Sequence, residues 1–94
     1  MNITDIKIRR LFDSDPLRAI VSVTFDNALA VHDIKVIHTK SSDRYFVVMP
    51  SREGTDGTFH DIVHPINSAS REKLENAVLE AYHVKLAAEQ KPQE

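Results

Sequence analysis

The sequence predicts an α+β domain, in which an antiparallel β-meander of about five strands is followed by one long C-terminal α-helix. Two observations predict this fold. In several short segments before residue 64, apolar residues alternate with polar ones, which is the period of a half-buried strand. From Ser68 onward the apolar residues recur every three or four positions, which is the period of an amphipathic helix. The connections between the extended segments are short, and short connections join antiparallel neighbours.

The first two strands are expected at residues 2–12 and 17–26. Residues 2–12 alternate well enough for a strand, with one face formed by Thr4, Ile6 and Ile8. Residues 17–26 alternate most clearly, and one face carries only apolar side chains: Leu17, Ala19, Val21, Val23 and Phe25. The polar run from Asp13 to Pro16 has the composition of a turn between them.

Strands three and four are expected at residues 29–38 and 44–49, joined by a polar turn at residues 39–43. The third strand has apolar side chains on both faces, with Ala30, Ile34 and Val36 opposite Leu29, Val31 and Ile37. Such a pattern indicates a strand that is buried on two faces or lies against a partner.

A further hairpin is expected between the fourth strand and the helix. Pro50 cannot donate a ladder hydrogen bond, so it ends the fourth strand or lies at an edge. Asp56-Gly57 tolerates positive φ and therefore predicts a turn. Residues 59–63 resume extended structure as the fifth strand, until Pro65 breaks it.

The helix is expected from Ser68 to about Ala88, with Asn67 or Ser68 as its cap. Its apolar stripe consists of Leu74, Ala77, Val78, Ala81 and Tyr82. A helix of this length runs ~30 Å and crosses most of a small sheet. Residues 89–94 are polar and are expected to fray, so the single expected domain spans residues 1–88.

One helix covers only one face of such a sheet. The apolar side chains of the second face, chiefly those of strands three and four, then need another cover. A chain of 94 residues also buries only about two-thirds of the surface that its unfolded form exposes. A homodimer formed through the sheet would answer both needs, and we predict one.

Composition excludes several classes of function. The absence of cysteine excludes a disulfide framework and a thiolate zinc site. No apolar run approaches the ~18 residues of a membrane span, and the N-terminus has no signal-peptide pattern, so we expect a cytoplasmic protein without a membrane partner. The net charge of −2 and the pI of about 6.2 argue against a module that is basic as a whole. Any nucleic-acid binding would therefore need a local basic patch.

The residues give little support to catalysis or to a bound metal. His60 and His64 would lie ~13 Å apart in an extended segment, which is too far to share one ion. His32 is better explained as a strand histidine that is hydrogen-bonded near a dimer interface or the surface. Ser51 and Ser68 lie in no nucleophile elbow, and neither glycine lies in a phosphate-binding loop. We therefore expect no enzyme activity, no cofactor and no small-molecule substrate.

The basic residues are candidates for phosphate contacts. They lie on the first strand, after Pro50 and in the first turns of the helix: Lys7, Arg9, Arg10, Arg52, Arg71 and Lys73. A helix N-terminus attracts phosphate through its free N–H groups and its dipole, and cations placed there cost some helix stability. The alternative is a solvated helix face with Glu72 and Glu75 interleaved, and the residues alone favour that alternative.

Motifs along the whole chain resemble one known family. They are Thr4-Asp5, Arg9-Arg10, Leu17-Arg18-Ala19, Val31-His32-Asp33-Ile34, Met49-Pro50-Ser51 with a basic residue after it, Asp56-Gly57 with Phe59, and His64-Pro65-Ile66-Asn67-Ser68. These motifs extend over roughly residues 1–83. Their order is similar to that in the stage V sporulation protein G family, whose members are bacterial septation regulators.

The resemblance implies a homodimeric regulator that binds DNA, with RNA binding also attributed to some members. The basic pair after Met-Pro-Ser is the part associated with DNA contact, which assigns Arg52, together with the preceding Ser51, to the interface. Arg71, Lys73 and Arg9 would add phosphate contacts. Glu53 departs from the family pattern, because an anion stands where the second cation of a basic pair is usual.

Two functions remain open from the sequence. The first is a cytoplasmic regulator of septation and gene expression that binds nucleic acid as a homodimer. The second is a protein-interaction module in cell division that makes no nucleic-acid contact. The acidic pI and Glu53 favour the second, and the resemblance of the loop favours the first.

Overall fold

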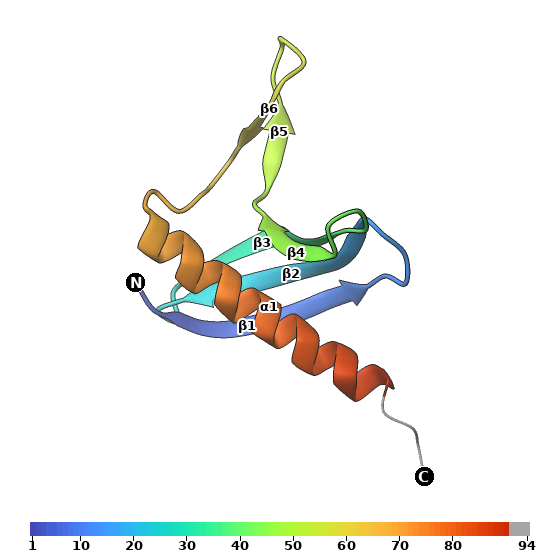
Figure 1. The fold of residues 1–94 in the computed structure, drawn as a ribbon. Coiled ribbons are helices and arrows are strands. Elements are labelled where there is room, and N and C mark those ends of the chain that lie inside the picture. Colours follow the sequence, from blue (N-terminus) through green and yellow to red (C-terminus); the bar gives the residue numbers. More distant parts are fainter. Residues whose placement is uncertain (91–94) are drawn as a thin grey trace.

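The computed structural model describes residues 1–90 and shows a four-stranded antiparallel sheet, a small hairpin and one long helix (Figure 1). The elements follow the order β1 (Ile3–Leu11), β2 (Leu17–Phe25), β3 (Leu29–Thr39), β4 (Arg44–Val48), β5 (Ser51–Glu53), β6 (Phe59–Asp61) and α1 (Ser68–Gln90). The main sheet has the strand order β1-β2-β3-β4, which is the predicted meander. The α+β fold class is therefore confirmed.

The fifth strand forms, but it does not join the main sheet. β6 pairs antiparallel with β5, and the two make a separate sheet. The separation begins at Pro50, which has no N–H to continue the ladder of β4. Its carbonyl instead accepts a hydrogen bond of 2.8 Å from the Ile62 backbone N–H, which closes the base of the hairpin. The chain leaves the sheet at Pro50, and the hairpin projects away from it (Figure 1).

The core lies between one face of the main sheet and the apolar stripe of α1. Its fully or nearly fully buried members are Ala19, Val21, Val23, Ile34, Val36, Val47, Met49, Leu74, Val78 and Tyr82. The strand residues of this set come from β2, β3 and β4 or directly follow β4, and β1 contributes the half-buried Ile6 and Ile8. The apolar stripe predicted for the helix and the apolar face predicted for strand two therefore pack in the same core.

The apolar faces predicted for strand three are wrong in part, because β3 contains a β-bulge. His32 and Asp33 together lie opposite the single residue Ser22, and Asp33 has a φ of 63°. The extra residue shifts the alternation, so that Val31 packs against the same core as Ile34. The third strand is thus less apolar on its outer face than its sequence indicates.

A second bulge moves Leu17 out of its predicted face. Leu17 pairs with Ile37, whereas Ala19 pairs with the adjacent Val36, so Arg18 is the extra residue. Val36 is buried in the core, and Ile37 and Leu17 therefore lie on the opposite face. In the same register row, Ile37 pairs with Phe46 of β4. These three side chains form an apolar row on the outer face.

The start of α1 matches the predicted cap. The Asn67 side-chain oxygen accepts a hydrogen bond of 2.8 Å from the Ser70 backbone N–H. The Asn67 backbone carbonyl accepts a hydrogen bond of 3.1 Å from the Arg71 backbone N–H. The helix runs to Gln90, which is two residues beyond the end expected for the helix and for the domain. Residues 91–94 of the predicted frayed tail lie outside the described residues.

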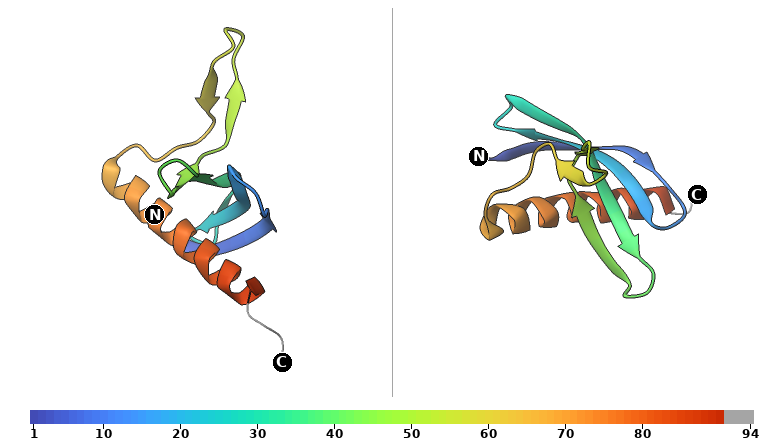
Figure 2. Two further views of the ribbon diagram at one scale, coloured as in Figure 1. Left: turned by 45° about the vertical axis from the view of Figure 1, so that its right-hand side comes forward. Right: turned by 90° about the horizontal axis from the view of Figure 1, so that it is seen from above.

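α1 lies along one face of the main sheet, and the other face is uncovered within residues 1–90 (Figure 2). We call this uncovered side the open face. It carries the side chains that alternate with the core residues, and Lys7, Arg9, Arg10, Lys35 and Phe46 are exposed there. None of the described helices is both long and apolar enough to cross a membrane.

Candidate functional site

The hairpin is the most exposed structured part of the described chain, and we call residues 50–66 the arm. All six residues of β5 and β6 are exposed. The register pairs Ser51 with Asp61, Arg52 with His60 and Glu53 with Phe59. The predicted site residues Ser51 and Arg52 thus lie side by side on a two-stranded ribbon that projects from the sheet (Figures 1 and 2).

The tip of the arm is held by its own polar contacts. Gly57 adopts a φ of 83°, and its N–H donates to the Gly54 carbonyl at 3.1 Å. The Asp56 carboxylate accepts hydrogen bonds from the Thr58 hydroxyl at 2.7 Å and from its backbone N–H at 3.1 Å. These two bonds lower the pKa of Asp56, because they stabilise its charged form. The turn predicted at Asp56-Gly57 is therefore confirmed.

The surface of the arm is mixed in charge and carries apolar side chains. Arg52 is its cation, while Glu53, Asp56 and Asp61 are exposed carboxylates. Phe59, Ile62 and Ile66 are 71%, 65% and 88% exposed. None of these apolar side chains contributes to the core, so the arm presents them to whatever it contacts.

The start of α1 places the next two predicted residues in an exposed turn. Arg71 and Lys73 are both exposed and stand on one helix, four and six residues after the cap Asn67. Asn67 already occupies the Ser70 N–H, which removes one of the free amides that an anion would use. Lys73 also borders an apolar cavity of about 160 Å³ under the first turns of the helix, lined by Ile3, Phe25, Leu29, Val31, Met49 and Leu74.

The last predicted residue, Arg9, lies on the open face and not with the others. Its Nε donates to the Ser22 hydroxyl at 3.1 Å, and the same oxygen lies 2.8 Å from His32 Nδ1. The interpretation of His32 as a hydrogen-bonded strand histidine is therefore confirmed. The five predicted site residues fall on three surfaces: the arm, the helix start and the open face.

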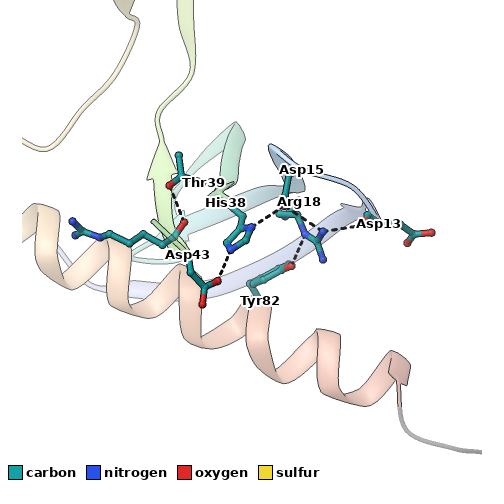
Figure 3. Close-up of polar contacts among 8 residues, drawn as sticks. Asp13, Asp15, Arg18, His38, Thr39, Asp43 and Tyr82 are labelled. Carbon is teal, nitrogen blue, oxygen red and sulfur yellow. Dashed lines mark hydrogen bonds and ion pairs between the residues drawn. The ribbon is translucent and has the colours of Figure 1, made fainter. Parts of the chain in front are cut away.

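A polar cluster between the β1–β2 turn, the end of β3 and α1 was not anticipated from the sequence (Figure 3). Asp15 and Asp43 lie on opposite sides of the His38 ring, each 2.8 Å from one of its nitrogens. The bond to Asp43 and then the bond to Asp15 raise the pKa of His38. Arg18 reaches the Tyr82 hydroxyl at 3.4 Å and the Asp13 carbonyl at 3.0 Å. This cluster ties the β1–β2 turn to the helix.

The described residues contain no group of three or more histidine, cysteine, aspartate or glutamate side chains placed to hold a metal ion. The two carboxylates beside His38 are joined to its ring nitrogens, so their geometry is that of an ion pair. His60 in the arm is engaged with its neighbours, since its Nε2 lies 2.9 Å from the Thr58 hydroxyl.

Comparison with known proteins points to a single family. Residues 1–84 match the SpoVG family. A relative in Desulforudis audaxviator, named "Putative septation protein SpoVG", is 49% identical over 89 residues, which cover 95% of this chain and 99% of the relative. Relatives of the same name in Clostridium acetobutylicum and Clostridioides difficile (strain 630) are 52% and 51% identical over 82 and 83 residues. These cover 87% and 88% of this chain and 84% and 88% of the relatives.

Proposed function

This chain belongs to the SpoVG family, and we propose that it acts in septation as a homodimeric regulator that binds nucleic acid. The names of its relatives support the role in septation. DNA is the first candidate ligand and RNA the second. The proposed role is one of binding, without catalysis, in the cytoplasm.

The observation that carries the proposal is the exposed two-stranded ribbon of the arm. Its strands pair only with each other within the described chain, and Arg52 stands on one of them with its side chain exposed. The major groove of B-DNA is wide enough to admit a two-stranded antiparallel ribbon. A ribbon of this kind approaches phosphates with its basic side chains and base edges with its faces.

Arg52 would neutralise a phosphate, and the neighbouring Ser51 hydroxyl would donate a hydrogen bond to a phosphate oxygen. Arg71 and Lys73 would supply further backbone contacts from the helix start. The carboxylate of Glu53 next to Arg52 repels phosphate, so we expect weak and salt-sensitive binding by the arm.

The homodimer would cover the apolar row of the open face, formed by Leu17, Ile37 and Phe46. Phe46 is 38% exposed, and a second copy of the chain is a partner of matching chemistry for such a row. The small core of a chain of this length supports the same proposal, because an added interface supplies burial that the single chain lacks.

Electrophoretic mobility shifts test the nucleic-acid proposal. The purified protein is mixed with mixed-sequence duplex DNA and with single-stranded RNA at roughly 50 mM and 200 mM salt. We expect binding at the lower salt, weakened about tenfold at the higher salt if two phosphates are neutralised. No binding to either polymer at the lower salt would contradict the proposal.

A protein-interaction module is the second candidate, and the surface of the arm favours it. The exposed Phe59 and Ile62 resemble the apolar anchors of protein interfaces, and the carboxylates of Glu53 and Asp61 do not suit a polyanion. The substitution Phe59→Ala distinguishes the two functions. A protein contact would be lost with this substitution, whereas a phosphate contact through Arg52 would remain.

A further inference from the structure

Apart from Tyr82, Ser22 is the one buried side chain with a polar group among residues 1–89, at 6% exposed, and it lies on the uncovered side of the sheet. Its neighbours Val21 and Val23 point into the core, so the Ser22 side chain points to the open face. A side chain on an uncovered face is buried only when other side chains lie across it. Arg9 and His32 do so, since both contact its hydroxyl.

The hydrogen bonds fix how the two covering groups are oriented. A guanidinium can only donate, so Ser22 Oγ accepts the bond of 3.1 Å from Arg9 Nε. The single hydroxyl hydrogen is then free to be donated to His32 Nδ1, 2.8 Å away. In the neutral ring the remaining proton is on Nε2. The two Nη groups of Arg9 and the Nε2–H of His32 are thus left as donors on two side chains that meet at one hydroxyl.

Two β-bulges place these side chains over the same residue. On β1, Arg9 is the extra residue between the pairs Ile8–Val21 and Arg10–Ile20. On β3, His32 and Asp33 share the position opposite Ser22, and Asp33 takes a positive φ, which Asp tolerates better than most residues. Bulges re-aim side chains and are common beside functional sites.

The surroundings carry positive charge in a chain that is acidic as a whole. Lys7 pairs with Ser22 in the register, and Arg10 and Lys35 flank Ile20 from either side. All three side chains are exposed. Asp5 and Asp33 are the carboxylates of β1 and β3 that lie closest to Ser22 in the register. The open face around Ser22 therefore carries more cations than anions, although the chain has a net charge of −2.

We propose that Arg9 and His32, held in place by Ser22, form a phosphate-binding site on the open face, and that its ligand is a phosphodiester group of the nucleic-acid backbone. The proposal rests on the function proposed above and adds a second contact surface to the arm. A guanidinium that already donates through Nε presents its two Nη groups to a phosphate in the geometry that arginine favours.

This site leaves room for the proposed dimer. Leu17, at one end of the apolar row, lies five residues from Ser22 along β2, which is roughly 16 Å in a strand. A second copy seated on the row near Phe46 would cover that end of the face. Each subunit would then keep its own phosphate site.

Binding of a fluorescent duplex DNA and of a fluorescent single-stranded RNA over a salt series tests the proposal in the full chain. Arg9→Gln should reduce the slope of log affinity against log salt by ~0.9 per lost contact for the duplex and ~0.7 for the single strand. Ser22→Ala keeps every charge but releases Arg9 and His32, and should weaken binding several-fold. Lys40→Gln, which removes one charge from the exposed β3–β4 turn, is the matched control and should leave the slope unchanged.

A titration with inorganic phosphate, followed by NMR of the Arg9 Nε–H and the His32 ring, tests the site without any polymer. We expect saturable changes in the chemical shifts of these groups on addition of phosphate. Sodium chloride of equal ionic strength should not reproduce these changes, and Ser22→Ala should abolish them. Polymer binding that is equal in wild type, Arg9→Gln and Ser22→Ala, with no phosphate shifts, would overturn the site and leave the proposed function standing. Phosphate shifts without polymer binding would overturn both the nucleic-acid ligand of this site and the proposed function, and would leave only an anion site at Arg9 and His32.

Discussion

The sheet-and-helix body and the arm are built on the same antiparallel pairing, yet they differ in what holds them. In the body, β2, β3 and α1 bury side chains such as Val21, Val36 and Val78 completely. In the arm, every residue of β5 and β6 is exposed. The shape of the arm comes from the turn at Gly57 and from the bond between Ile62 and Pro50.

The difference separates folding from recognition within one short chain. Burial of apolar surface stabilises the body, so its substitutions should change the free energy of unfolding. The arm contributes no member of the core, so its substitutions should change binding and leave folding nearly intact. Substitutions in the body and in the arm test this separation, because they should differ in their effect on folding.

Leu74→Ala should cost ~2–5 kcal/mol of unfolding free energy, because it opens a cavity between α1 and the sheet. Leu74 is 5% exposed in the core, and a domain of this size has only ~5–15 kcal/mol in total. Urea denaturation followed by circular dichroism measures the loss. Phe59→Ala, at a side chain 71% exposed in the arm, is the control and should stay within about 0.5 kcal/mol. Comparable losses in the two variants would show that the arm is also part of the folded core.

Phe46→Glu should dissociate the proposed dimer, because it places a charge in the apolar row of the open face. Light scattering at micromolar concentration should give about twice the chain mass of 10.7 kDa for wild type and the single mass for the variant. Phe59→Glu is the matched control and should remain dimeric. If Phe59→Glu is the variant that dissociates, the second copy is held by the arm and not by the sheet. A folded wild-type monomer would rule out the dimer.

His38→Gln should change how the stability of the body depends on pH. The carboxylates of Asp43 and Asp15 raise the pKa of His38 in the folded state above its unfolded value of about 6.5. The stabilisation is therefore fully present below pH ~6.5 and is lost as the pH rises through the folded pKa. Melting temperatures of wild type and variant, compared from about pH 6 upward, should differ most at the low end. A difference that is constant with pH would show that the ring is not charged in the folded protein.

The sequence predicted the elements of the body well, because their patterns are local. The alternation of residues 17–26 and the stripe around Leu74 and Val78 follow from periodicity alone, and both are seen in the core. The turn at Asp56-Gly57 follows from the tolerance of glycine for positive φ.

The features that the sequence did not predict are β-bulges, which depend on single inserted residues, and contacts between residues far apart in the chain. The bulges at Arg18 and at His32-Asp33 shift the alternation of faces, and no periodicity signals one extra residue. The ion pairs of His38 join residues from two different turns, so spacing could not reveal them. The tolerance of aspartate for positive φ at Asp33 is the one local sign of a bulge that the sequence offered.

The smallest effect on folding is expected for substitutions on β5 of the arm, where the effect on binding should be clearest. Glu53 is exposed on β5 beside Arg52, so Glu53→Lys should change the free energy of unfolding by no more than about 0.5 kcal/mol. The same substitution replaces an anion by a cation on the ribbon. If the arm contacts DNA phosphates, affinity should rise, and the slope of log affinity against log salt should steepen by ~0.9, or ~1.8 for the two arms of a dimer.

Arg52→Ala should move both affinity and slope in the opposite direction, because it removes the cation that β5 carries. The measurement is DNA affinity over a salt series for wild type and the two arm variants, with unfolding curves recorded on the same samples. Unchanged slopes in both folded variants would exclude the arm from the nucleic-acid interface. If Arg9→Gln still lowered the slope in that case, the open face would carry the contact alone. The arm, with Phe59 and Ile62 exposed, would then be left for a protein partner.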